Sequence, residues 1–153
     1  MGKFDRFLRK TQKDDRAADN AVWNICWDGK YDSGFRGNKQ IGDVADLIEI
    51  LKTRDPDGDA EFVLCRSDMK NQNLTMSVTD DKWFLYFFPE DEAVCGFQSL
   101  GEDRGDDGTT SMPAGSNIEV CNYTLVTGEV AFKAAREFMT TGEMPLCVDW
   151  DEL

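Results

Sequence analysis

The sequence predicts an α+β fold in which a largely antiparallel sheet of about five to six strands packs with two main helices. Apolar residues recur with helical spacing in two segments, and runs typical of strands lie mostly between those segments. With 153 residues, of which 41% are hydrophobic, the chain is long enough to bury a substantial core in one domain. A change in composition near residue 20 predicts a mobile N-terminal arm, residues 1–20, followed by a single domain, residues 21–153.

The N-terminal arm is predicted to begin as a short basic helix. Phe4, Phe7 and Leu8 follow a helical spacing, but the pattern stops within residues 11–20. A mobile arm is the simpler interpretation, and a tether for nucleic acid is the alternative, because the arm holds six Lys and Arg residues against four Asp.

A strand and then a helix are predicted next. Trp23, Ile25 and Trp27 alternate with other residues on one face of a strand, and residues 28–34 form a turn. The helix that follows has about 12 residues and ends at residues 54–59. Its apolar face consists of Ile41, Val44, Leu47, Ile48 and Leu51.

The middle of the chain is a run of strands. Residues 82–88 are apolar on both faces, which predicts a central strand of a sheet that is covered by helices. Residues 79–82 form a hairpin turn, and residues 101–116 a long polar loop. The four strands predicted here are residues 61–66, 73–78, 82–88 and 93–100.

A strand, a helix and a closing strand complete the fold. Residues 117–126 have strand character, and the second main helix runs from an N-cap at Thr127 to a C-cap at Gly142. Its apolar face consists of Val130, Ala131, Ala134, Ala135 and Phe138. Residues 146–150, LCVDW, form the closing strand, in which Leu146, Val148 and Trp150 face the core while the acidic neighbours of Trp150 face water.

Several kinds of chemistry are excluded by composition. The chain has no histidine, so catalysis by Ser-His-Asp or Cys-His and zinc sites with His ligands are impossible. Its five cysteines are scattered without C-x-x-C spacing and are expected to be reduced. Residues 55–61 resemble a calcium loop, but Gly58 falls at position four and Arg66 at position twelve, so we expect a turn. The sequence therefore predicts no catalytic residue, no metal and no cofactor.

The predicted domain is strongly acidic. Because the N-terminal arm contains six of the 17 basic and four of the 30 acidic residues, 11 basic and 26 acidic residues remain in residues 21–153, a net charge of −15. Such a surface repels nucleic acid and anionic membranes and attracts basic proteins. We expect neither nucleic acid nor membrane as a partner. No apolar run reaches the roughly 20 residues of a membrane span, and the first residues lack the apolar core of a signal peptide, which predicts a cytoplasmic location.

Two acidic clusters are candidates for contacts with a basic partner. They occupy residues 89–92 and 101–108 and flank the predicted strand 93–100, so they lie at opposite ends of it unless another element folds between them. Solvated loops without a binding role are the alternative. The predicted contact residues are Glu90, Asp91, Glu92, Glu102, Asp103, Asp106 and Asp107.

Motifs in residues 94–153 resemble immunity protein family 1, the cytoplasmic antidotes encoded beside polymorphic bacterial toxins, which are commonly nucleic-acid deaminases. The first two motifs are Ser99-Leu100-Gly101 and residues 112–118. The third contains Ala135, Arg136, Glu137, Phe138, Gly142, Pro145, Cys147, Val148 and Trp150. Met144 departs from the pattern, because many members carry a basic residue there. The matching positions suit caps, turns and core, so they do not locate a binding face.

The resemblance implies an antidote that is not an enzyme. Such a protein would bind one cognate toxin in a one-to-one complex and occlude its basic active-site cleft, which agrees with the acidic surface. Two alternatives remain open: an acidic nucleic-acid mimic or adaptor without a dedicated toxin, and a hydrolase that uses clustered carboxylates with a metal ion.

Overall fold

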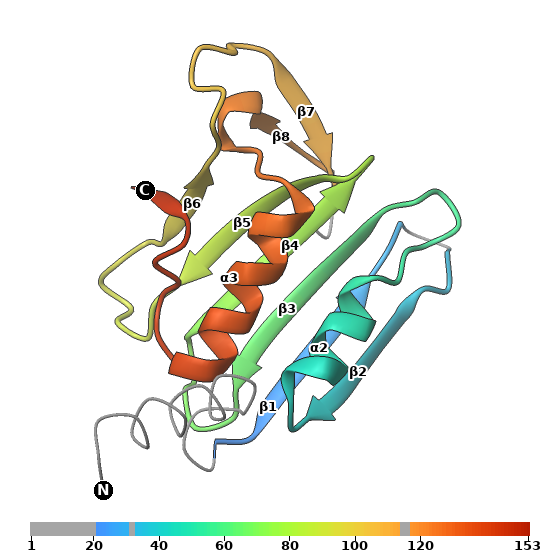
Figure 1. Ribbon diagram of the computed structural model, residues 1–153, viewed down its shortest axis with the longest axis vertical. Helices are drawn as coiled ribbons and strands as arrows, with labels where there is room; N and C mark the ends of the chain where they lie inside the picture. Colours follow the sequence, from blue (N-terminus) through green and yellow to red (C-terminus); the bar gives the residue numbers. More distant parts are fainter. Residues whose placement is uncertain (1–20, 31–32, 114–116) are drawn as a thin grey trace, which may run out of the picture.

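The computed structural model describes residues 21–30, 33–113 and 117–153, which form an antiparallel sheet with two helices, α2 and α3, on one face (Figure 1). This confirms the predicted α+β fold. The sheet has seven strands, more than predicted, and a separate two-stranded sheet accompanies it. The predicted N-terminal helix lies outside the described residues.

The strands of the main sheet follow the order β2-β1-β3-β4-β5-β6-β9, and each neighbouring pair is antiparallel. Strands β2 and β9 are therefore its two edges. The elements are β1 (Trp23–Asp28), β2 (Arg36–Ile41), α2 (Val44–Leu51), β3 (Ala60–Arg66), β4 (Asn73–Thr79), β5 (Lys82–Phe88), β6 (Phe97–Leu100), β7 (Thr109–Met112), β8 (Ile118–Cys121), a short 3-10 helix (Asn122–Thr124), α3 (Gly128–Thr141) and β9 (Asp149–Glu152).

Helix α3 begins and ends where its cap residues predict. The Thr127 side chain accepts a hydrogen bond from the Val130 N–H at 3.3 Å, which closes the first turn. Gly142 ends the helix with a φ of 74°, a left-handed conformation that favours glycine. Phe138, fully buried, packs edge-on against Trp23 of β1 with a centroid distance of 4.9 Å. The core therefore lies between α3 and the sheet.

Helix α2 is shorter than predicted. It has eight residues instead of about 12, and Ile41 belongs to strand β2. Asp43 is its N-cap and accepts the Asp46 N–H at 2.9 Å. Strand β2 was not predicted, because residues 36–40, RGNKQ, are polar and show no alternation of apolar and polar residues. An edge strand can have such a sequence, and in β2 only Ile41 is buried.

The turn between α2 and β3 is held by one buried carboxylate. Asp55 accepts backbone N–H groups of Lys30, Asp57 and Asp59, each at 2.9 Å. Burial alone would raise the pKa of Asp55, but these donors outweigh it and hold the pKa below its ordinary value. Residues 55–61 are thus a helix-to-strand turn, as predicted.

Strand β5 is apolar on both faces for two different reasons. Trp83, Leu85 and Phe87 face the helices. On the other face, Phe84 packs against Met112 of β7 and Val120 of β8. The prediction that helices cover both faces is therefore wrong, because a β-hairpin covers part of the second face. Strand β7 lies inside the predicted polar loop 101–116, where its residues TTSM give little apolar signal.

The C-terminal segment differs from the prediction at Leu146, whose surface is 84% exposed. Glu137 of α3 accepts the backbone N–H groups of Leu146 and Cys147 at 2.9 and 3.1 Å, which holds this segment against the helix instead of in the sheet. Strand β9 begins at Asp149, after the predicted start. Val148 is buried and Trp150 packs against the core, as predicted. In the described residues, no helix is long and apolar enough to cross a membrane.

Candidate acidic binding site

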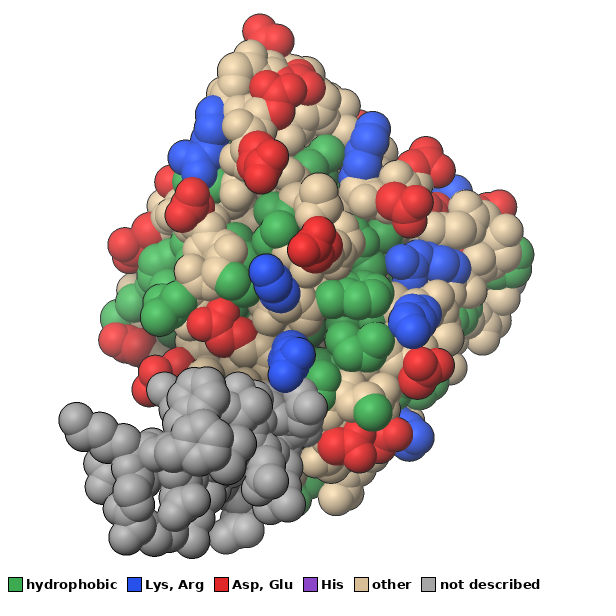
Figure 2. Space-filling model, in the orientation of Figure 1, with side chains coloured by type: hydrophobic (Ala, Val, Ile, Leu, Met, Phe, Trp, Pro, Cys, Tyr) green, Lys and Arg blue, Asp and Glu red, His purple; other side chains and the backbone are tan. Residues whose placement is uncertain are grey.

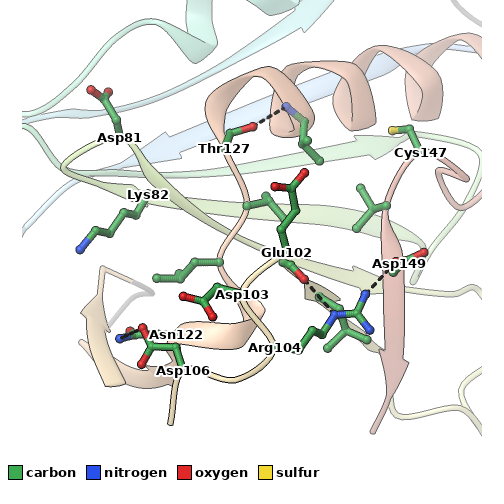
Figure 3. Close-up of a pocket in the computed structure, with 16 residues that line it drawn as sticks. Asp81, Lys82, Glu102, Asp103, Arg104, Asp106, Asn122, Thr127, Cys147 and Asp149 are labelled. Atoms are coloured by element: carbon green, nitrogen blue, oxygen red, sulfur yellow. Dashed lines mark hydrogen bonds and ion pairs between the residues drawn. The ribbon is translucent and has the colours of Figure 1, made fainter. Parts of the chain in front are cut away.

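An open groove of about 610 Å³ lies at the end of the sheet where β5 begins and β6 ends (Figure 3). Because β5 and β6 are antiparallel neighbours, the turn that precedes β5 meets the loop that follows β6. The start of α3 and the segment that leads into β9 close the other sides. Leu100, Leu125, Val126, Val130 and Val148 give the groove apolar lining.

The polar lining of the groove is mainly acidic. It contains five carboxylates against two cations, Lys82 and Arg104. The five carboxylates are Asp81, Glu102, Asp103, Asp106 and Asp149. Asp and Glu side chains also gather along the upper left of the helix-bearing face in Figure 2, with few Lys and Arg side chains among them. The groove therefore favours a positively charged ligand.

Two of the polar side chains hold the loop 101–108 in place. Arg104 pairs with Asp149 at 2.7 Å and donates its Nε–H to the Gly101 carbonyl at 2.8 Å. Asp106 accepts the Gly108 N–H at 2.9 Å and the Asn122 side-chain amide at 3.2 Å. These contacts fix the wall of the groove.

Gly101 explains one of the sequence motifs. A Cβ at this position would collide with the Leu125 carbonyl, so no larger residue fits. The Gly101 N–H donates to the Tyr123 carbonyl at 2.7 Å. The motif Ser99-Leu100-Gly101 is thus a close contact between β6 and the 3-10 helix, and it places the next residue, Glu102, at the groove.

Three acidic side chains near this end of the sheet are free. Within the described residues, the carboxylates of Glu102, Asp103 and Asp107 accept no hydrogen bond and form no ion pair. Asp81 also lacks a hydrogen bond there, but it interacts electrostatically with Arg54. Glu102 points toward the start of α3, and Asp103 points toward the side of the groove where Lys82 and Asn122 lie (Figure 3). The three free carboxylates keep their full capacity to bind an external cation.

In the other acidic cluster, residues 89–92, Glu90 and Glu92 form hydrogen bonds within the protein. Glu90 accepts the backbone N–H groups of Lys70, Asn71 and Gln72 at 3.2, 2.9 and 3.0 Å. These bonds, led by the one from Asn71, hold the pKa of Glu90 below its ordinary value. Glu92 accepts the Asn71 side-chain amide at 3.0 Å. This cluster fastens the β3–β4 loop to the β5–β6 loop.

The structure does not bring the two predicted clusters together. They lie beyond opposite ends of β6 (Figure 1), and none of the described elements joins them into one patch. Glu102, Asp103 and Asp106 line the groove, whereas Asp91 and Glu92 line a separate hollow of about 410 Å³ beside Phe88. That these seven residues contact a partner stays a prediction.

Two of the five groove carboxylates, Asp81 and Asp149, were not predicted from the sequence. Asp81 belongs to the hairpin turn 79–82, which the structure confirms, with left-handed φ values of 47° at Asp80 and 59° at Asp81. A signal existed for Asp81: in two consecutive antiparallel strands, the turn before the first lies beside the loop after the second. No comparable signal pointed to Asp149, because its place depends on the pairing of β9 with β6.

The groove does not contain an activated nucleophile of the cysteine type. Cys147 lines it, but burial, together with the neighbouring Glu137, raises the pKa of its thiol to about 11. A thiol with that pKa stays protonated near neutral pH and reacts slowly. In the part of the chain that the structure describes, no group of three or more Cys, Asp or Glu side chains is arranged to hold a metal ion.

Comparison with known proteins gives two findings. The model of the family described as Immunity protein Imm1 matches residues 38–152, which include all of the groove residues. The chain is also similar to a protein of Burkholderia cenocepacia (strain H111) that is named double-stranded DNA deaminase immunity protein. The two are 25% identical over 125 residues, which cover 80% of this chain and 99% of that protein.

Proposed function

The chain belongs to the Imm1 family of immunity proteins. We propose that it neutralises a cognate deaminase toxin by binding over the toxin's basic active-site cleft with the acidic rim of its groove. The family implies a role as an inhibitor that performs no catalysis. The name of the Burkholderia relative supports a deaminase as the target. The cognate toxin would act on nucleic acid, and the complex would contain one copy of each protein.

The observation that carries this proposal is the set of free carboxylates around an apolar surface. Glu102 and Asp103 line the groove without partners of their own among the described residues, and Leu100 and Val130 contribute to its lining. Protein interfaces commonly combine an apolar centre with a polar rim. A cleft that binds nucleic acid must be basic, so this rim is complementary to it.

The mechanism follows from charge and shape. The net charge of −15 in residues 21–153 would speed the encounter with a basic toxin. Once seated, the domain would exclude nucleic acid from the cleft, because the two compete for the same basic residues. A stable complex would bury on the order of 1,600 Å² in total.

Two further expectations belong to this proposal. Residues 21–153 would suffice for inhibition as one domain, preceded by a mobile basic arm at residues 1–20. The protein would act in the cytoplasm, where it would protect the cell's own nucleic acid.

The test is inhibition of the purified toxin in a deaminase assay on single- and double-stranded DNA and on RNA. We expect activity to fall linearly with added immunity protein and to vanish at one equivalent, and sedimentation to show a one-to-one complex. Residual activity at saturating immunity protein, without a stable complex, would contradict the proposal.

A further inference from the structure

Strand β9 forms one edge of the main sheet and adjoins the groove. Asp149, its first residue, lines the groove, and the segment before it contributes Cys147 and Val148 to the same lining. In the described part of the chain, β6 is the one strand that pairs with β9. The opposite edge of β9 therefore has unpaired backbone groups.

The register identifies those groups. Leu153 N–H donates to the Gly96 carbonyl at 2.9 Å, and the register of β6 and β9 places these two residues opposite each other. In an antiparallel pair, residues bonded to the partner strand alternate with residues that are not. Trp150 and Glu152 belong to the second kind, so their N–H and C=O groups point away from β6.

The side chains of β9 give this edge a negative charge. Asp149, Asp151 and Glu152 are exposed, and Trp150 packs against the core. Arg104 pairs with Asp149, and Asp151 accepts the Gln98 side-chain amide at 3.1 Å. Within the described residues, the carboxylates of Asp151 and Glu152 have no opposite charge beside them. The other edge of the sheet, β2, carries Arg36 and Lys39 instead. The two edges would thus attract different partners.

We propose that β9 is the docking edge for an extended, basic segment of the toxin, which adds to the sheet as an eighth strand. Its backbone would bond to Trp150 and Glu152, and its Lys or Arg side chains would meet Asp151 and Glu152. This inference rests on the proposed function, since the partner it names is the toxin. It places the groove and β9 in one continuous interface.

The charge of β9 argues against a second copy of the chain as the occupant. An antiparallel pair of β9 strands would bring the carboxylates of Asp149, Asp151 and Glu152 from both copies together. Like charges opposite each other destabilise a strand pair. A partner strand with basic side chains removes this repulsion and gains ion pairs.

The experiment compares Glu152→Pro with Glu152→Ala in the full chain. Both variants remove the carboxylate, but proline also removes the outward N–H and places its ring where a new strand would bond. Proline is tolerated on an edge strand when its nitrogen faces solvent. We therefore expect both variants to melt within a few degrees of the original chain, while affinity for the toxin falls a few-fold in Glu152→Ala and at least tenfold further in Glu152→Pro.

A second measurement makes the test independent of variant stability. Amide exchange of the original chain is followed residue by residue, free and bound to the toxin. We expect the Trp150 and Glu152 amides to become protected in the complex, because they exchange freely when the edge is open. The chain without toxin is also examined by sedimentation, and we expect it to be monomeric.

The outcomes separate this inference from the proposed function. If the original chain neither binds nor inhibits the toxin, the proposed function fails, and the inference fails with it. If the toxin binds but the two variants have equal affinity and the two amides exchange unchanged, the docking edge alone is refuted. Self-association that Glu152→Pro abolishes would assign the edge to a second copy and overturn the inference.

Discussion

The loop before β6 and the loop after it are both acidic, but their carboxylates have different partners. In residues 89–92, Glu90 accepts three backbone N–H groups, and Glu92 accepts a side-chain amide. In residues 101–108, Glu102 and Asp103 have no partner in the described structure and face the groove. The difference teaches that charge density alone does not identify a binding surface. A carboxylate that stabilises the fold is less available to a partner than one that is free.

The largest effect is expected when the free carboxylates are reversed. Glu102→Lys/Asp103→Lys puts two positive charges at the groove, where the toxin's cleft is basic. Like charges across an interface cost several kcal/mol, so we expect affinity to fall by about 100-fold or more. Calorimetry or surface plasmon resonance with the purified variant and toxin would measure this loss of affinity. An unchanged melting temperature of the variant would show that its fold is intact.

The matched control is Asp91→Lys/Glu92→Lys at the other end of β6, which leaves Glu90 intact and changes the net charge equally. We expect its affinity to stay within about threefold of the original chain, because screening at physiological salt acts over about 8 Å. A larger loss for this pair than for the groove pair would reverse the comparison.

A smaller effect, on stability, is expected for Glu90→Gln. The pKa of Glu90 is lowered in the folded protein, so its contribution is present at neutral pH and is lost as the pH falls through that lowered pKa. The variant should melt a few degrees below the original chain at pH 7, and the gap should narrow as the pH falls below about 4. Glu102→Gln, which removes a carboxylate without partners, serves as the control.

Melting curves between pH 7 and pH 3 provide the measurement. A gap between Glu90→Gln and the original chain that is constant over this range, or equal losses in the two variants, would show that the backbone bonds of Glu90 do not depend on its charge.

The smallest effect is expected for Arg104→Gln. This change removes one of the two cations of the groove and frees Asp149, so the groove becomes more negative. The ion pair is exposed, and such pairs contribute about 0–1 kcal/mol, so the fold should survive. We expect the association rate with the toxin to rise a few-fold at low salt.

Arg36→Gln is the matched control. Arg36 lies on β2, at the other edge of the sheet, and it pairs with Asp28 of β1. Stopped-flow measurements should show little change for it. Equal acceleration in both variants would indicate that net charge matters and that the position of the groove does not.

The parts of the fold that follow from local chemistry could be predicted from the sequence. Helix α3 is one example, since Thr127 and Gly142 supply its caps and its apolar face is continuous. Strands β2 and β7 were missed, because both are mostly polar and are stabilised by pairing with β1 and β8. Local patterns do not contain that information.

The candidate site could be predicted only in part, because some of its residues are identified by local sequence and others by long-range contacts. Glu102 and Asp103 stand out in the sequence as members of an acidic loop, and the structure places both at the groove. Glu90 stands out equally, but its bonds to residues 70–72 depend on a contact between two loops. Asp149 reaches the groove through the pairing of the last strand with β6, which is a long-range feature.

The central claim is that the toxin covers the free carboxylates and leaves the engaged cluster uncovered. Carbodiimide labelling of carboxylates, read by mass spectrometry on the free chain and on the complex, tests it directly. We predict that labelling of Glu102, Asp103 and Asp107 falls sharply in the complex, while labelling of Asp91 and Glu92 stays the same. Protection of Asp91 and Glu92 with unchanged labelling at Glu102 and Asp103 would contradict this account.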